Sequence, residues 1–177
     1  VFFTMLFNGG IVPSYILISQ WLRLRDTLAA LIVPLLVNAW FVIIMKGFLS
    51  DIPESIPESA KIDGASEFVI FTRIIIPISK PAIATVSLFI ALNYWNDWFL
   101  SMLYIDNERL YSLQYLLVRI IRNMEFLKAE VAGRYLGLDK IKTPTLSARM
   151  AICVLAAGPM LFVFPFFQKY FVKGLAV

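Results

Sequence analysis

The segment from Ile56 to Pro81 reads I-P-E-S-A-K-I-D-G-A-S-E-F-V-I-F-T-R-I-I-I-P-I-S-K-P and is the most polar block of an otherwise apolar chain. It lies between two apolar segments that are long enough to cross a bilayer, so we expect a loop outside the membrane. Pro57 suits the first turn of a short helix, and Gly64 permits a close bend. A second helical run is expected to end at about Ile76, because Pro77 cannot continue it. The pattern predicts two short helices that could dock into a partner.

The composition is that of an integral membrane protein. Of the 177 residues, 60% are hydrophobic and 16% are charged, and the mean hydropathy is +0.79. A soluble domain of this length carries about 25% charged residues. We therefore predict an all-α protein that crosses a bilayer.

About four segments are apolar enough to span a bilayer, and prolines inside such helices are tolerated where neighbours satisfy the freed carbonyls. These segments run from Val1 to Leu22, Thr27 to Met45, Pro81 to Tyr104 and Met150 to Tyr170. The first is interrupted by Asn8-Gly9-Gly10 and Pro13, and the second contains Pro34 and Asn38. No repeat or low-complexity linker divides the chain, which favours one membrane domain over residues 1–177. The chain opens inside an apolar run without Met, so we expect it to be incomplete at its N-terminus.

The long segment 105–149 is predicted to contain an amphipathic helix. Its apolar side chains recur at helical spacing with charged ones between them, a pattern typical of a helix lying on a membrane face or a partner subunit. The apolar set is Leu113, Leu116, Leu117, Ile120, Ile121, Met124 and Leu127, and the charged set is Arg119, Arg122, Glu125 and Lys128.

Residues that could carry catalysis are scarce. The chain has no histidine and only one cysteine, Cys153, which leaves no metal cluster and no usual general base. None of the eight glycines belongs to a phosphate-binding G-x-x-x-x-G-K-[ST] loop, and no basic run suggests nucleic acid. We expect no cofactor and no enzymatic activity, so any ATP-driven process needs a separate ATPase subunit.

The third apolar segment holds a polar cluster, which we take as a candidate substrate path. Asn93, Asn96 and Asp97 are three and four residues apart and are predicted to share one helical face. An ionisable residue in a span is costly unless it faces a bundle interior or water, and the ring of Trp95 could stack on a sugar. Two alternatives stay open: Trp95 and Trp98 as interfacial belt residues, and the asparagines or Asp97 as ties between helices.

The polar loop resembles the cytoplasmic signature of the permease subunits of bacterial ABC importers. That signature reads E-A-A, three residues, G, nine residues, I-x-L-P, and here Glu58-Ser59-Ala60, Gly64 and Ile74 to Pro77 match it at that spacing. Ser59 and Ile76 depart from it conservatively. Asp63-Gly64-Ala65 is similar to the D-G-A of the sugar-importing branch; the alternative is a solvated loop with accidental spacing.

The resemblance extends over nearly the whole chain and is closest to the oligosaccharide branch of the maltose-type permeases. Phe7 to Pro13, Trp95 to Trp98 and Phe164 to Gly174 carry it outside the loop. It implies a type I ABC importer bundle from a subunit of about six spans, two of which would precede Val1.

The resemblance also implies roles and partners for a subunit in a bacterial inner membrane. Residues 46–80 would be a cytoplasmic coupling loop in which Glu58 to Ala65 enter a cleft of an ATPase subunit, with Glu58 paired to a basic group. The small residues would let the loop seat closely, and Pro77 would end it; this coupling set is Glu58, Ser59, Ala60, Asp63, Gly64, Ala65 and Pro77. Segment 105–149 would face outward, where a solute-binding protein delivers a carbohydrate, and a second permease, most simply in a hetero-dimer, would share the lipid bilayer.

The charge distribution favours the opposite orientation. Six of the 16 Lys and Arg residues lie on the side of the signature loop, and the other ten lie on the far side. The positive-inside rule weakens for long loops and is often decided by the first helix. We therefore orient the chain by the signature.

Three alternative functions remain open at this point. The chain could be an ABC permease for a non-sugar solute such as an amino acid, phosphonate or peptide. It could be an ion-coupled secondary carrier with Asp97 as its ion site, in which case uptake would collapse with an uncoupler. It could also be a membrane scaffold without transport.

Overall fold

The computed structural model describes residues 1–7, 9–134 and 145–174, with side chains over 1–7, 9–126 and 146–165. Every regular element in these ranges is helical, which confirms the predicted all-α class. The α-helices are α1 Phe2–Leu6, α2 Ile11–Ile16, α3 Leu28–Ile32, α4 Ala39–Ser50, α5 Ser55–Ile62, α6 Glu67–Ile70, α7 Ile76–Ile78, α8 Lys80–Asn96, α9 Phe99–Tyr104, α10 Leu113–Arg134 and α11 Thr145–Gly174. Two π-helical turns, η1 Leu17–Trp21 and η3 Phe71–Ile75, and two 3₁₀ turns, η2 Val33–Leu35 and η4 Glu108–Leu110, complete the set.

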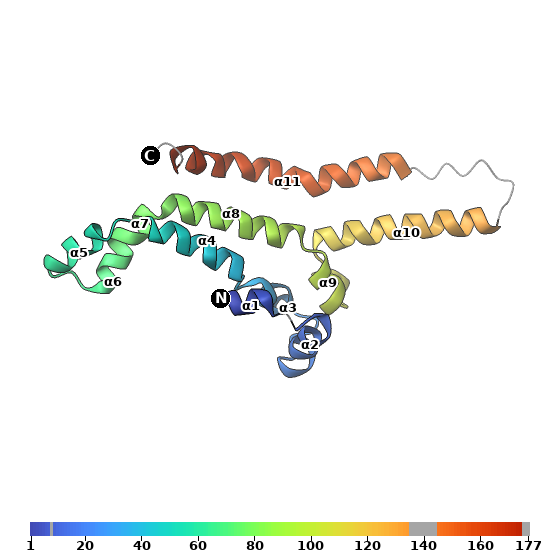
Figure 1. Cartoon of the computed structure of the whole chain (residues 1–177). Coiled ribbons are helices and arrows are strands. Elements are labelled where there is room, and N and C mark those ends of the chain that lie inside the picture. The colour runs from blue at the N-terminus through green and yellow to red at the C-terminus, as the bar shows by residue number, and fades with distance from the viewer. Residues whose placement is uncertain (8, 135–144, 175–177) are drawn as a thin grey trace.

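Helices α8 and α11 lie side by side along the molecule, and α4 packs along α8 (Figure 1). Helices α5 and α6 project at one end of this group, while α9 and α10 follow the other end of α8. The two segments predicted to lie on opposite sides of a membrane are thus at opposite ends of α8.

Helix α11 is long and apolar enough on its own to cross a membrane, over Leu146–Pro165. Two further candidates satisfy the same criteria only if a bent pair of helices counts as one span. These pairs are Leu28–Leu35 with Ala39–Ser50, bent by 48°, and Glu67–Ile78 with Lys80–Asn96, bent by 73°.

The interruption predicted within the first apolar segment, Val1 to Leu22, is found in the structure, where α1 and α2 are separate helices. The chain breaks between α1 and α2, where Gly10 adopts φ +83°. Pro13 in the first turn of α2 has no N–H to bond the carbonyl four residues earlier. A left-handed glycine followed by a proline therefore separates two short helices.

The prediction that Pro77 ends the second helix of the loop is wrong. Helical backbone continues to Ile78, and the 73° bend follows at Ser79. The π-turn η3 precedes Pro77, with the Ile76 N–H bonded to the Phe71 carbonyl. Because Pro77 and Pro81 both lack an N–H, the helical ladder is weakened on each side of Ser79, which places the bend there.

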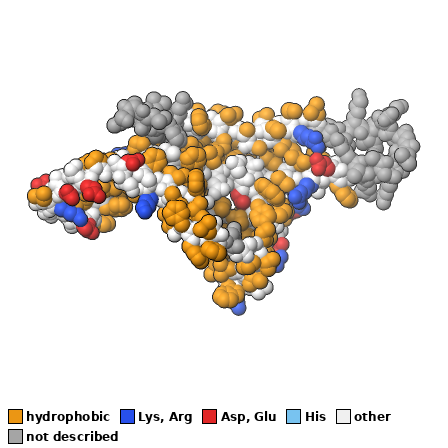
Figure 2. Space-filling view, in the orientation of Figure 1, with side chains coloured by type: hydrophobic (Ala, Val, Ile, Leu, Met, Phe, Trp, Pro, Cys, Tyr) orange, Lys and Arg blue, Asp and Glu red, His pale blue; other side chains and the backbone are white. Residues whose placement is uncertain are grey.

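One cluster of buried hydrophobic side chains lies at the end of α8 opposite the loop. Ile18, Ala30, Leu100, Tyr104 and Ile105 form it, and the ring of Tyr15 stacks on Tyr104 with 5.9 Å between centroids. Elsewhere hydrophobic side chains cover much of the visible surface, while charged ones gather mostly at the projecting loop and around α9 and α10 (Figure 2). An apolar middle between charged ends is the surface that a bilayer requires.

Two distant loops are tied together beside this core. Asp26, at φ +60°, accepts hydrogen bonds at Oδ1 from the N–H groups of Asp106 at 3.1 Å and Asn107 at 2.8 Å. The Asp26 N–H donates to the Tyr104 carbonyl at 2.9 Å. Arg25 Nη2 lies 2.8 Å from Asp106 Oδ2. We call residues 23–27 and 97–112 the clamped end.

Candidate functional site

We call α5 to α7, residues 55–78, the knob. Helix α5 ends in a Schellman motif, in which the Gly64 N–H bonds the Lys61 carbonyl and the Ala65 N–H bonds the Ala60 carbonyl, both at 3.0 Å. Gly64 has φ +81°, a backbone conformation that glycine adopts without strain. The glycine and two of the alanines in the signature-like pattern thus build one turn, which confirms the predicted bend at Gly64.

Short-range contacts hold the rest of the knob. Lys61 Nζ lies 3.0 Å from Glu67 Oε1 across the turn. The Val69 N–H donates to Ser66 Oγ at 3.4 Å and so caps α6, as serine commonly does at a helix start. Ser59 Oγ donates to the Ile56 carbonyl at 3.0 Å.

The knob presents its signature residues outward. Glu58, Ser59, Asp63, Gly64 and Pro77 are exposed, and Ala60 and Ala65 are half-buried. Within the described side chains, neither Glu58 nor Asp63 has an ion-pair partner. A Cβ at Gly64 would meet no atom within 4 Å, so the chain itself leaves room for a side chain there.

Sequence reasoning missed two apolar residues of the knob. Ile62 is 86% exposed and Phe68 is 75% exposed, although each lies in the most polar block of the chain. For Ile62, its position between Lys61 and Asp63 was the available signal, whereas Phe68 begins an apolar run and had no such signal. Apolar side chains exposed beside carboxylates form a surface suited to docking rather than to catalysis.

The polar cluster at the end of α8 mainly joins helices through its aromatic residues. Trp95 Nε1 donates to the Ala156 carbonyl of α11 at 2.9 Å, and the Tyr94 hydroxyl donates to the Ile32 carbonyl of α3 at 2.8 Å. The Ala156 carbonyl is one turn before Pro159, where a proline loosens the helical ladder. Trp95 therefore acts as a tie between helices, a role the sequence analysis left open for the asparagines.

Asn93 and Asn96 lie three residues apart on α8, but Asp97 does not share their helical face, because α8 ends at Asn96 and Asp97 is extended with ψ 115°. The prediction of one shared face is therefore wrong for Asp97. The Asp97 carboxylate accepts from the Leu100 N–H at 3.3 Å and caps the start of α9. The backbone carbonyl of Asp97 accepts a hydrogen bond from the Ser112 hydroxyl at 3.1 Å.

A cavity of about 290 Å³ between α8 and α11 contains part of the candidate path. Trp95 and Asn96 line it, whereas Asn93 and Asp97 do not. The remaining lining is apolar and comprises Leu88, Leu92, Ala156, Ala157, Met160, Leu161 and Phe164. The structure thus brings together two of the four candidate path residues.

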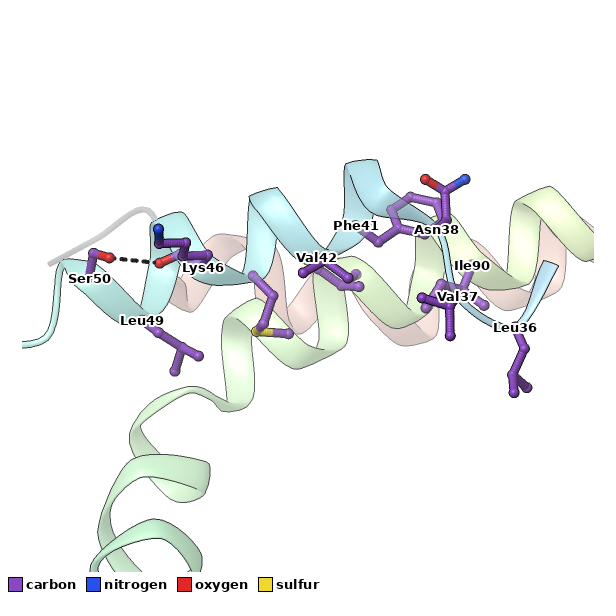
Figure 3. A pocket seen from close by; sticks show the side chains of 11 residues that line it. Leu36, Val37, Asn38, Phe41, Val42, Lys46, Leu49, Ser50 and Ile90 are labelled. Carbon is purple, nitrogen blue, oxygen red and sulfur yellow. Dashed lines mark hydrogen bonds between the residues drawn. The ribbon is translucent and has the colours of Figure 1, made fainter. Parts of the chain in front are cut away.

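A larger groove of about 680 Å³ runs between α4 and α8 (Figure 3). Its polar groups sit at its ends: Asn38 caps α4 by accepting from the Trp40 N–H at 2.9 Å, and Ser50 Oγ donates to the Lys46 carbonyl at 2.9 Å. The middle is lined by side chains such as Val42 and Ile90. Such a lining suits packing against apolar groups and offers little to sugar hydroxyls.

The comparisons with known proteins identify the family of this helical bundle. Residues 1–177 match the family model of the binding-protein-dependent transport system inner membrane component. The chain belongs to that family. Its architecture is that of a type I ABC importer permease, an integral membrane protein.

Two relatives are named as transport system permease proteins. The polygalacturonan/rhamnogalacturonan transport system permease protein YtcP of Bacillus subtilis is 41% identical over 98% of the chain and 59% of its own length. The arabinooligosaccharides transport system permease protein AraQ of the same species is 27% identical over 88% of the chain and 49% of its own length.

A solved structure agrees. The crystal structure of a bacterial ABC transporter involved in the import of the acidic polysaccharide alginate matches with a TM-score of 0.76 and 32% identity. The match covers 96% of the chain and 59% of that protein. The chain therefore spans about half to three fifths of the length of these relatives.

Proposed function

We propose that the protein is a membrane-spanning subunit of an ATP-driven importer of sugars or oligosaccharides in a bacterial inner membrane. Family membership and the names of the relatives support a carbohydrate substrate, and give no support to an ion-coupled carrier. The observation that carries the coupling role is the knob, a projecting pair of helices closed by a Schellman turn at Gly64.

The knob seats in a cleft of a separate ATPase subunit, which hydrolyses the ATP. Ile62 and Phe68 supply exposed apolar contacts, and Glu58 offers a carboxylate without a partner among the described side chains. Burying such groups against a complementary surface gives a small but specific interface. ATP-driven closure of two ATPase subunits then moves each knob together with the helix that follows it.

The remaining partners act at the other end and along the bundle. A solute-binding protein delivers carbohydrate to the outward-facing segment 105–149, and a second permease, as in a hetero-dimer, shares the translocation path. Trp95 and Asn96 contribute a ring and an amide to that path at the cavity between α8 and α11. Asn93 and Asp97 remain candidate path residues that the cavity does not include.

The test compares two glycine substitutions in the full-length protein expressed with its candidate ATPase. In Gly64→Asn, the new residue is asparagine, which tolerates the positive φ of this position. Its side chain enters space that the chain itself leaves open. Gly47→Asn is the matched control, because Gly47 also has open space around it. Although the sequence placed Gly47 at the start of the coupling loop 46–80, the structure places it on α4, in a candidate span and outside the knob.

We expect Gly64→Asn to insert normally, lose the ATPase on mild-detergent purification, and lower carbohydrate uptake by about tenfold or more, since a steric block at an interface centre costs several kcal/mol. Gly47→Asn should retain both the ATPase and uptake. Normal uptake and an intact complex with Gly64→Asn would overturn the coupling role.

A further inference from the structure

Two arginines of α10 each lie over an aromatic ring at the clamped end. Arg119 Cζ is 5.4 Å from the centroid of Tyr111, and Arg122 Cζ is 5.8 Å from the centroid of Trp98. Both distances are within the range of a cation–π contact. Each ring therefore limits the positions that its guanidinium group can take.

The two arginines differ in how their charge is compensated. Arg119 Nη1 lies 2.7 Å from Glu108 Oε1, and this hydrogen bond raises the pKa of Arg119 further above its usual value. No carboxylate of the described side chains forms an ion pair with Arg122.

The acidic groups near Arg122 in the sequence are engaged elsewhere. Glu125, one turn along α10, pairs with Arg149 of α11 at 2.9 Å. Asp97, beside Trp98, accepts from the Leu100 N–H. Arg122 is exposed, so its planar fork of N–H donors is held against a ring and open to an anion.

The position of this pair fits a substrate on its way into the bundle. Trp98 follows α8 directly, two residues after Asn96, which lines the cavity between α8 and α11. Arg122 approaches it from α10, the helix of the segment proposed to face outward. The pair thus lies at the end of α8 opposite the knob.

We propose that Arg122 and Trp98 form a binding site for a carboxylate-bearing sugar residue, so that the substrate is an acidic oligosaccharide. The inference rests on the proposed carbohydrate import. A guanidinium binds a carboxylate with two parallel hydrogen bonds, and an aromatic ring offers a flat apolar face to a pyranose. The adjoining ring favours a sugar over an acidic side chain of a docking protein.

The experiment measures ATP-driven uptake by the complete importer and its binding protein in proteoliposomes. The two probes are a galacturonic acid oligomer and the same oligomer with its carboxylates methyl-esterified. The variants are Arg122→Gln and Arg122→Lys. Arg109→Gln is the matched control, because Arg109 is exposed at the same end but has neither a ring contact nor an ion pair among the described side chains.

We expect Arg122→Gln to raise the KM for the acidic oligomer by about tenfold, the usual scale for a lost hydrogen-bonded charge, and to leave uptake of the ester unchanged. The KM of Arg122→Lys for the acidic oligomer should lie between those of the wild type and Arg122→Gln, because lysine keeps the positive charge but lacks the two parallel N–H donors of the guanidinium. Arg109→Gln should match the wild type.

The outcomes separate the two proposals. If Arg122→Gln lowered uptake of both probes to the same extent, Arg122 would be assigned to docking of the binding protein. If the KM for the acidic oligomer were unchanged, Arg122 would have no part in substrate recognition. Either result overturns this inference. Absence of any ATP-dependent carbohydrate uptake by the wild type would instead overturn the proposed function.

Discussion

The knob and the clamped end are held together in different ways. In the knob, the longest-range side-chain bond joins Lys61 to Glu67, six residues apart. At the clamped end, Asp26 bonds the N–H groups of Asp106 and Asn107, which are 80 and 81 residues away. The side-chain bonds of the knob thus join residues within one short segment, whereas those of the clamped end join parts of the chain that are far apart in sequence.

We therefore expect substitutions at the clamped end to affect stability and substitutions in the knob to affect the proposed coupling. The clamped end includes most of the buried core cluster, and hydrogen bonds accepted by Asp26 and Ser101 join its segments, so damage there should unfold the protein. The knob leaves large apolar groups such as Ile62 and Phe68 exposed. Damage there should spare the fold and affect only what binds to it.

The largest expected effect on stability comes from Ser101→Val. Ser101 is fully buried, and its Oγ accepts from the Ser112 N–H at 3.1 Å. Valine leaves that N–H without a partner and adds bulk, which should lower the free energy of unfolding by about 2–4 kcal/mol. Unfolding of the purified complex in detergent measures it. Ser59→Val in the knob is the control and should cost less than about 1 kcal/mol; equal losses would contradict the comparison.

A smaller effect is expected from Asp26→Gly. Glycine keeps the positive φ but removes the carboxylate that joins the two loops, at a cost of about 1–2 kcal/mol. Asp26→Asn should recover most of this loss, because its amide oxygen can accept the same bonds. Hydrogen exchange at Asp106 and Asn107 should quicken in Asp26→Gly alone, and unchanged exchange would show that the carboxylate does not hold the loops.

The smallest effect is expected from Lys61→Met. The ion pair with Glu67 is solvent-exposed on both sides, and such pairs contribute about 0–1 kcal/mol. The melting temperature should stay within about 2 °C of the wild type. A larger drop would mean that the knob depends on this pair and is less independent than its local bonds indicate.

Local patterns in the sequence predicted the local structure well. The bend at Gly64 and the amphipathic helix α10 follow from residue type and periodicity. The break at Gly10 also follows from residue type, because glycines and a proline interrupt the first apolar segment and the backbone there turns left-handed. The prediction at Pro77 failed because the π-turn before it accommodates the proline.

The candidate path was harder to predict because it depends on long-range contacts. Asp97 leaves the helix where its carbonyl bonds Ser112 and its carboxylate caps α9, and no spacing within α8 signals this. Trp95 reaches a carbonyl 61 residues away. The pairing of Arg122 with Trp98 is likewise invisible without the fold. The coupling and path assignments stay predictions.

If the knob couples to an ATPase as proposed, the 73° bend at Ser79 makes it a lever arm for α8. The arm from Glu67 to Ile78 has 12 residues and is therefore about 18 Å long. Because it stands nearly at right angles to α8, a sideways displacement of about 3 Å at its tip turns α8 by about 10° around its own axis. A movement of the knob would then rotate α8 about its axis and would not push it along that axis. At the far end of α8, a small rotation would change how Trp95 and Asn96 are oriented in the cavity that they line.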